Sequence, residues 1–140
     1  TPSTMQEKPE YPDVVGDVAG YLENRISDLA GCGLDPLTMA IDPGIGFGKT
    51  VEHNLCLLAK LERLVVLGRP VVVGLSRKSF LGSLTGRPVD ERLAPSIAAL
   101  VFSVLNGAQV MRVHDVGESV DAVRVITALR KIQNNNVTSQ

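Results

Sequence analysis

The sequence is poor in the residues that mark several large classes of protein. It has two cysteines among 140 residues, no tryptophan, and only 4% aromatic residues. Cys32 and Cys56 lack C-x-x-C spacing, which argues against a disulfide framework or a zinc site and favours a reducing, cytoplasmic setting. So few aromatic rings also leave little for stacking on nucleic-acid bases.

Neither charge nor hydropathy singles out a large partner. Lys and Arg total 14 and Asp and Glu total 15, giving a formal net charge of -1, so no overall field draws the chain to nucleic acid or to an anionic membrane. No apolar run approaches the roughly 18 residues that span a bilayer, and the first eight residues lack the order of a secretory signal. Any anion site must therefore be local.

What the sequence does contain is a regular alternation of helical and extended patterns. Apolar residues recur at helical spacing over residues 15–29, 51–65, 95–106 and 120–129. Glycines at 31 and 33, 68 and 107 are expected to end the first three helices. Three extended runs, residues 39–42, 70–76 and 109–114, lie between the helices. The polar tail, residues 134–140, is expected to be disordered.

This alternation predicts an α/β fold with a parallel sheet and right-handed crossovers. A complete (β/α)8 barrel needs about 200 to 400 residues, so the chain is expected to be either a small open α/β domain or a piece of something larger. No linker divides it, and residues 1–140 are treated as one unit.

Polar side chains close each predicted strand on one consistent face. Because side chains alternate faces along a strand, Asp42, Ser76, Arg112 and His114 fall on matching faces, and Lys78 lies just beyond the second strand. Each has an ordinary explanation when taken singly, as a cap, a small filler or a paired charge. Parallel strands gather their carboxyl ends at one edge, where ligands bind, so together these residues predict a ligand site.

The loop over residues 43–48 nearly matches two phosphate-binding motifs. Gly48-Lys49-Thr50 ends like a Walker A loop, but Pro43 stands where that motif requires its first glycine. The dinucleotide fingerprint G-x-G-x-x-G also fails, because the three glycines are evenly spaced by two. The glycines permit a tight turn, which leaves the apolar ring of Phe47 unexplained.

Three segments, taken together, resemble the signatures of the dihydropteroate synthase family in order and spacing. They are Ile41-Asp42-Pro43-Gly44-Ile45-Gly46-Phe47-Gly48-Lys49, Gly74-Leu75-Ser76-Arg77-Lys78-Ser79 and Arg112-Val113-His114-Asp115-Val116. Shorter similarities occur at Thr4-Met5-Gln6, Glu91-Arg92-Leu93 and Asn106-Gly107-Ala108. The resemblance covers residues 1–133.

The resemblance implies a fold and a reaction. The family is a (β/α)8 barrel that displaces pyrophosphate from a hydroxymethyl-dihydropterin with the amine of p-aminobenzoate, giving dihydropteroate for folate biosynthesis. Sulfonamide drugs act on it by mimicking p-aminobenzoate. This chain would supply the last three strand–helix units and would be a fragment with incomplete activity. Magnesium would accompany the pyrophosphate, with its ligands expected in the missing N-terminal half and none in this chain.

The resemblance also implies a role for five residues around the organic substrates. Asp42 would accept hydrogen bonds from the amino-pyrimidine edge of the pterin, which suits a carboxylate. Lys78 would contact the oxygen and ring nitrogen of the pterin, and Ser76 would border the p-aminobenzoate pocket. Phe47 and Gly74 would line the cavity.

At the leaving-group end, the resemblance implies that Arg112 and His114 hold the pyrophosphate, helped by the N-terminus of the last helix. Lys78, Arg112 and His114 would be the catalytic residues, since cationic groups stabilise the charge that develops on the leaving group.

Two other interpretations stay open. One is a P-loop-like nucleotide-binding domain that uses Lys49 and Thr50. The other is a non-catalytic scaffold. An open three-stranded sheet leaves apolar faces and two edges uncovered, so a homodimer or other self-association is expected.

Overall fold

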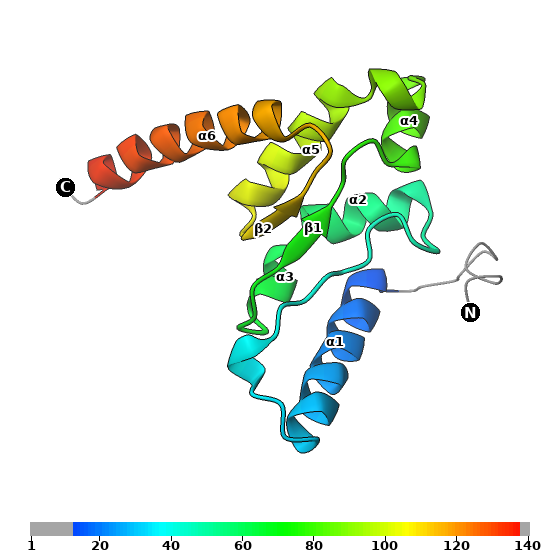
Figure 1. Cartoon of the computed structure of the whole chain (residues 1–140), viewed down its shortest axis with the longest axis vertical. Coiled ribbons are helices and arrows are strands. Elements are labelled where there is room, and N and C mark those ends of the chain that lie inside the picture. Colours follow the sequence, from blue (N-terminus) through cyan, green and yellow to red (C-terminus); the bar gives the residue numbers. More distant parts are fainter. Residues whose placement is uncertain (1–12, 138–140) are drawn as a thin grey trace.

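The structure is a computed structural model that describes residues 13–137, so the predicted similarity at Thr4-Met5-Gln6 lies outside it. Helices and short parallel strands alternate along the chain (Figure 1). In order they are α1 (Val14–Gly31), the 3-10 helix η1 (Pro36–Thr38), α2 (Val51–Ala59), α3 (Glu62–Val65), β1 (Val72–Gly74), α4 (Ser79–Thr85), the 3-10 helix η2 (Val89–Glu91), α5 (Leu93–Leu105), β2 (Val110–Arg112) and α6 (Val116–Val137). Over residues 13–137, no helix is long and apolar enough to cross a membrane.

Three extended segments run parallel, as predicted, in the spatial order Ile41, β1, β2. Val72 lies opposite Val110 and Gly74 lies opposite Arg112 in the β1–β2 pair. On the other side of β1, Ile41 forms a parallel bridge to the residue before Val72, and the Val72 N–H donates to the Ile41 carbonyl at 2.7 Å. The parallel order places the ends of all three segments at one edge.

The strands are shorter than the sequence predicted. In the run expected over residues 39–42, only Ile41 pairs with a neighbouring strand. Pro43 has no N–H to offer a ladder, and the Asp42 carboxylate accepts the Gly44 N–H at 2.8 Å, which turns the chain away from the sheet. The first predicted strand is therefore a single bridge followed by a tight turn.

The helix predicted over residues 51–65 is broken at Lys60 into α2 and α3. Around the break the hydrogen bonds tighten, because the Arg63 and Leu64 N–H groups donate to the carbonyls three residues earlier, Lys60 and Leu61. The apolar spacing continues across the break, and Leu61 and Leu64 are both fully buried. Hydrophobic periodicity therefore could not reveal it.

Two further features differ from the expected layout. Helix α4, absent from the predicted elements, follows β1 directly and buries Phe80 and Leu81. Helix α6 continues to Val137, so residues 134–137 are helical where a disordered tail was expected, and the rest of that tail lies outside the described residues. Figure 1 shows α6 running well away from the sheet.

The core lies on the side of the sheet that faces the helices. Val73 of β1 and its flanking neighbours Val71 and Leu75 alternate with outward residues and are almost completely buried. They join buried leucines of the α2–α3 region in one cluster: Leu57, Leu58, Leu61 and Leu64. Since β1 alternates faces, Gly74 turns to the opposite side of the sheet.

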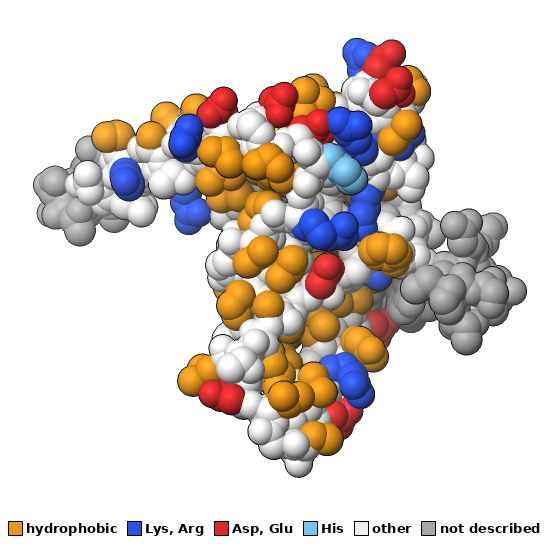
Figure 2. Space-filling view, viewed as in Figure 1, with side chains coloured by type: hydrophobic (Ala, Val, Ile, Leu, Met, Phe, Trp, Pro, Cys, Tyr) orange, Lys and Arg blue, Asp and Glu red, His pale blue; other side chains and the backbone are white. Residues whose placement is uncertain are grey.

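A second apolar surface is left uncovered beside β2. Val116 and Val120 of α6 are 60% and 41% exposed. Together with Met111 and Val123, these two valines border an open hollow between β2 and α6. Figure 2 shows hydrophobic side chains gathered on this face. A contiguous patch of this kind usually marks a surface that packs against something else.

Candidate functional site

Lys78 connects the two loops that follow Ile41 and β1. Its ammonium donates to the Ile45 carbonyl and lies 4.1 Å from the centroid of the Phe47 ring, a cation–π contact. Its alkyl chain crosses Gly46, where an added Cβ would lie 2.6 Å from Lys78 Cδ. The glycine at 46, at a φ of +81°, therefore makes room for the lysine.

Lys49 binds the backbone of the glycine loop to which it belongs. Its ammonium donates to the Gly44 carbonyl at 3.0 Å and to the Phe47 carbonyl at 3.2 Å. A phosphate-binding loop presents backbone N–H groups to its ligand, whereas this loop turns carbonyl oxygens towards its own lysine. Thr50, the other residue of the Walker-like ending, caps helix α2 by accepting the His53 N–H.

Asn54 fixes the same loop and was missed by sequence reasoning. The side chain is 1% exposed. Its Oδ1 accepts the Gly46 N–H at 2.7 Å, and its Nδ2 donates to the Thr50 carbonyl at 2.8 Å. The available signal was a polar residue among the apolar positions of the buried face of α2, because buried amides need hydrogen-bond partners.

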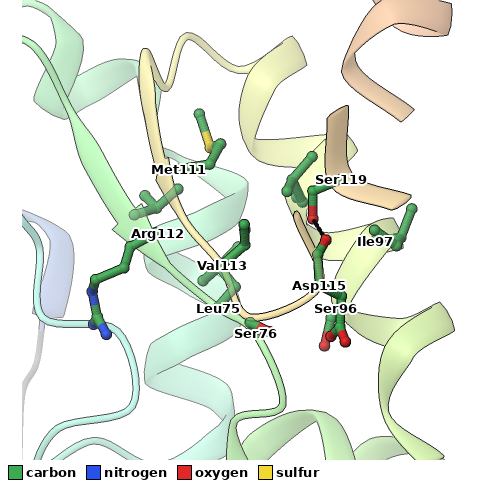
Figure 3. A pocket seen from close by; sticks show the side chains of 11 residues that line it. Leu75, Ser76, Ser96, Ile97, Met111, Arg112, Val113, Asp115 and Ser119 are labelled. Carbon is green, nitrogen blue, oxygen red and sulfur yellow. Dashed lines mark hydrogen bonds between the residues drawn. The ribbon is translucent and has the colours of Figure 1, made fainter. Parts of the chain in front are cut away.

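On the outer face of the sheet, Arg112 lies across Gly74. A Cβ added at Gly74 would stand 2.6 Å from Arg112 Nη2, and the two residues are paired in the β1–β2 register. The space that the missing side chain leaves is filled here by a guanidinium. Figure 3 shows Arg112 projecting away from Met111 and Ile97, which line a narrow cleft on the helix side of the sheet.

The ends of β1 and β2 are joined through Ser76 and Arg77. The Ser76 hydroxyl accepts the His114 N–H at 3.3 Å. Arg77 forms a two-pronged ion pair with Asp115, with Nε at 3.2 Å from Oδ2 and Nη2 donating to Oδ1. Neither Arg77 nor Asp115 was singled out from the sequence as a site residue.

The structure brings some of the predicted site residues together more closely than others. Asp42, Lys78 and Arg112 interact electrostatically, and Phe47 contacts Lys78 directly. His114 is connected to this group through its backbone bond to Ser76. Figure 2 shows basic and acidic side chains and a histidine close together on one face. The predicted roles of these residues towards substrate remain predictions.

Partial burial and neighbouring charges act on both lysines. Loss of hydration lowers the pKa of Lys78, the Asp42 carboxylate opposes that effect, and the cations of Arg112 and Lys49 add to it. Loss of hydration also lowers the pKa of Lys49, again opposed by Asp42. The site thus holds two lysines whose ammonium groups are less stable than in water, beside one carboxylate.

The described residues offer no ready-made cage of side chains for magnesium. Among residues 13–137 there is no cluster of three or more His, Cys, Asp or Glu side chains placed to hold a metal ion. Asp42 Oδ1 is also engaged by the Gly44 N–H.

The chain matches known proteins along most of its length. The model of the pterin binding enzyme family matches residues 1–114. Dihydropteroate synthase from Neisseria meningitidis serogroup B is 46% identical over 132 residues, which cover 91% of this chain and 46% of that protein. The chain thus spans about half the length of the curated relatives that it matches.

Solved structures give the same result. Dihydropteroate synthase from Yersinia pestis, in complex with a sulfonamide drug, superposes with a TM-score of 0.89 at 38% identity. The match covers 92% of this chain and 47% of the Yersinia pestis chain. The Xanthomonas albilineans enzyme in complex with 7,8-dihydropteroate gives a TM-score of 0.86 at 45% identity, covering 89% and 48%. These neighbours have the (β/α)8 barrel fold, so the predicted fold class is confirmed as part of such a barrel.

We expect Asn54→Ala to loosen the glycine loop. The substitution leaves the Gly46 N–H without its partner and removes one of the two hydrogen bonds that the Thr50 carbonyl accepts, at a cost of about 1–3 kcal/mol in the free energy of unfolding. Urea denaturation measures the loss, and NMR hydrogen exchange should show faster exchange at the Gly46 amide. Asn24→Ala, at an exposed position on α1, is the matched control and should stay within about 0.5 kcal/mol. Unchanged exchange at Gly46 would contradict this role for Asn54.

We also expect the pKa of Lys78 to respond in opposite directions to its two charged neighbours. Asp42→Asn removes an anion and should lower the Lys78 pKa further below its ordinary 10.5, whereas Arg112→Gln removes a cation and should raise it. NMR titration of the lysine side-chain signals measures both shifts. Arg124→Gln, on the exposed surface of α6, should leave the titration unchanged. Shifts of the same sign in the two variants would show that the three charges do not share one site.

Proposed function

The chain belongs to the pterin binding enzyme family, and on that basis we propose that it carries the C-terminal part of the dihydropteroate synthase active site. The reaction would join a hydroxymethyl-dihydropterin pyrophosphate to p-aminobenzoate and release pyrophosphate. The main support is the group formed by Asp42, Lys78 and Arg112 at the carboxyl ends of three parallel segments, where barrel enzymes bind their substrates. The Xanthomonas albilineans relative is described in complex with 7,8-dihydropteroate.

In this proposal, Asp42 and Lys78 bind the pterin. The carboxylate of Asp42 is exposed and accepts hydrogen bonds from the amino-pyrimidine edge, while the ammonium of Lys78 donates to the ring oxygen and nitrogen. Phe47 lies over Lys78 and forms a wall of the cavity. Ser76, at the end of the next strand, borders the p-aminobenzoate pocket, and Gly74 lines the floor beside it.

Arg112 and His114 hold the pyrophosphate in the same proposal. Both are exposed on the face where Gly74 leaves space for the guanidinium. As the C–O bond to pyrophosphate breaks, negative charge grows on the leaving oxygens, and hydrogen-bond donors aimed at those oxygens stabilise it. The amine of p-aminobenzoate then attacks the pterin carbon and loses a proton. The chain's own residues thus bind, orient and stabilise charge without a covalent intermediate.

The nucleotide-binding alternative has no observation in its favour. The ammonium of Lys49 is committed to two loop carbonyls, and the Gly46 N–H is already taken by Asn54. Neither the Lys49 ammonium nor the Gly46 N–H is therefore available to bind a phosphate. In the Walker-like ending, Lys49 stabilises the loop and Thr50 caps the start of α2.

We also propose that the chain associates with a second copy through the uncovered face of β2 and α6. The exposed valines there, Val116 and Val120, belong to a surface that half a barrel leaves open, and a second half-length chain offers the same apolar chemistry in return. We propose a cytoplasmic setting as well, because Cys32 and Cys56 are both free thiols.

The pterin proposal predicts that Asp42→Ala weakens binding of hydroxymethyl-dihydropterin pyrophosphate at least tenfold, since a hydrogen bond to a charged group contributes about 1.5–3 kcal/mol. Isothermal titration calorimetry of the chain measures the affinity, with ATP as a control ligand that should not bind. Asp121→Ala, at an exposed carboxylate on α6, is the matched control. ATP binding that is lost in Lys49→Met would replace the pterin proposal with the nucleotide one.

The association proposal predicts a dimer or larger species in light scattering at micromolar concentration. Val120→Glu places a charge on the shared apolar face and should shift the population towards monomer. Val66→Glu introduces the same change at a position that is 81% exposed in the bend after α3 and should have no effect. A folded monomer in the unsubstituted chain would show that this face needs no cover.

A further inference from the structure

Arg77 has a backbone conformation that its residue type disfavours. Its φ is +59°, and it is the one non-glycine residue at positive φ in the part of the chain that the structure describes. The left-handed conformation suits glycine, which has no Cβ to clash. A large side chain persists in it where its surroundings fix it, and such positions gather at functional sites. Position 77 therefore carries an arginine although glycine would adopt this backbone conformation with less strain.

Two segments hold Arg77 in this turn: α5 with its N-cap Arg92, and the loop after β2. Its N–H donates to Ser96 Oγ of α5 at 2.9 Å. Its carbonyl accepts a hydrogen bond from Arg92 Nη1 at 3.1 Å. Its guanidinium pairs with both oxygens of Asp115, which follows β2. Backbone and side chain are thus fixed by different elements, and the fixed turn sets the directions of the neighbouring residues.

The neighbours of this ion pair are the residues proposed to hold the two ends of the substrate. Arg77 stands between Ser76 and Lys78 in the chain, and Asp115 follows His114 directly. A second bond runs beside the ion pair, because Ser76 Oγ accepts the His114 N–H. Asp115 is itself fixed by α6. Its backbone carbonyl accepts a hydrogen bond from the hydroxyl of Ser119, in the first turn of that helix, at 2.6 Å (Figure 3). The loop after β1 and the loop after β2 are therefore fastened together.

We propose that Arg77 is a positioning residue, whose left-handed turn and ion pair with Asp115 set the separation between Lys78 and His114. This inference rests on the proposed function, because the separation matters only if one ligand spans both residues. A pterin pyrophosphate does so: its ring would contact Lys78 and its phosphates His114. Arg77 itself need not touch the ligand.

The Arg77–Asp115 ion pair by itself contributes little to the free energy of unfolding. The side chain of Arg77 is 37% exposed and that of Asp115 17% exposed, and solvent-accessible pairs are screened by water. The contact with Asp115 raises the pKa of the Arg77 guanidinium and lowers the pKa of the Asp115 carboxyl, so both stay charged at neutral pH. Replacing Arg77 with glycine should leave the fold intact, because glycine accepts the left-handed turn.

The first test uses the unliganded chain. Arg77→Gly and Asp115→Asn should each raise the hydrogen-exchange rate of the His114 amide at least tenfold in NMR, because each removes the ion pair that fastens the two loops. Arg87→Ala, which removes an exposed arginine from its pair with Glu91, is the matched control and should leave the rate unchanged. Arg77→Lys, which restores one donor, should recover part of the protection. An unchanged His114 rate in Arg77→Gly overturns the proposal whatever the ligand results.

The second test separates positioning from general damage by calorimetry with three probes: hydroxymethyl-dihydropterin pyrophosphate, hydroxymethylpterin and inorganic pyrophosphate. In Arg77→Gly the whole ligand should bind at least tenfold more weakly, while each half should stay within about threefold of the unsubstituted chain, since only the whole ligand depends on the spacing. Equal losses for all three probes would overturn the positioning role. If the unsubstituted chain binds none of them, the proposed function fails, and the exchange experiment still decides whether Arg77 fastens the loops.

Discussion

The candidate site depends most on the position of one ammonium group. Lys78 follows β1, yet its Nζ is bound to the Ile45 carbonyl in the loop after the neighbouring segment, and the ring of Phe47 covers it. The lysine thereby ties together two loops that the sheet places side by side without joining. Its hydration is reduced in doing so, and Asp42 offsets part of that cost. The glycine at 46, the carboxylate at 42 and the aromatic ring are all arranged around this single cation.

The glycine loop shows how a phosphate-like motif can have the opposite electrostatic character. In a phosphate-binding loop the N–H groups converge on the ligand and the lysine completes a positive cradle. Here the ammonium of Lys49 occupies the centre and is surrounded by carbonyl oxygens of Gly44 and Phe47. Spacing alone does not separate the two cases. The residue that does is Pro43, which has no N–H to contribute and is followed by a turn around the Asp42 carboxylate.

Sequence reasoning recovered the parallel order and the shared edge, because both follow from alternation of strand and helix and from the two-residue period of a strand. It placed Asp42, Ser76, Lys78, Arg112 and His114 at that edge for the same reason. It could not find the break between α2 and α3, where apolar spacing continues across a change in hydrogen bonding. Sequence reasoning missed Asn54 and Arg77 because their roles depend on partners elsewhere in the chain. Asn54 follows two other polar residues, Glu52 and His53, and only its bond to Gly46 sets it apart. Arg77 owes its conformation to Ser96, Arg92 and Asp115.

The long sequence separation of the site contacts has a kinetic consequence. The contacts from Lys78 to Ile45, from Ser76 to His114 and from Arg77 to Asp115 each join residues 33 to 38 positions apart. Each must close a long loop of chain before it returns any stabilisation, so the intervening helices have to dock first. The site should therefore assemble late in folding, after the leucine cluster behind β1, and should open before that cluster does. A destabilised chain could then keep its helices and its core while it loses the geometry needed to bind a ligand.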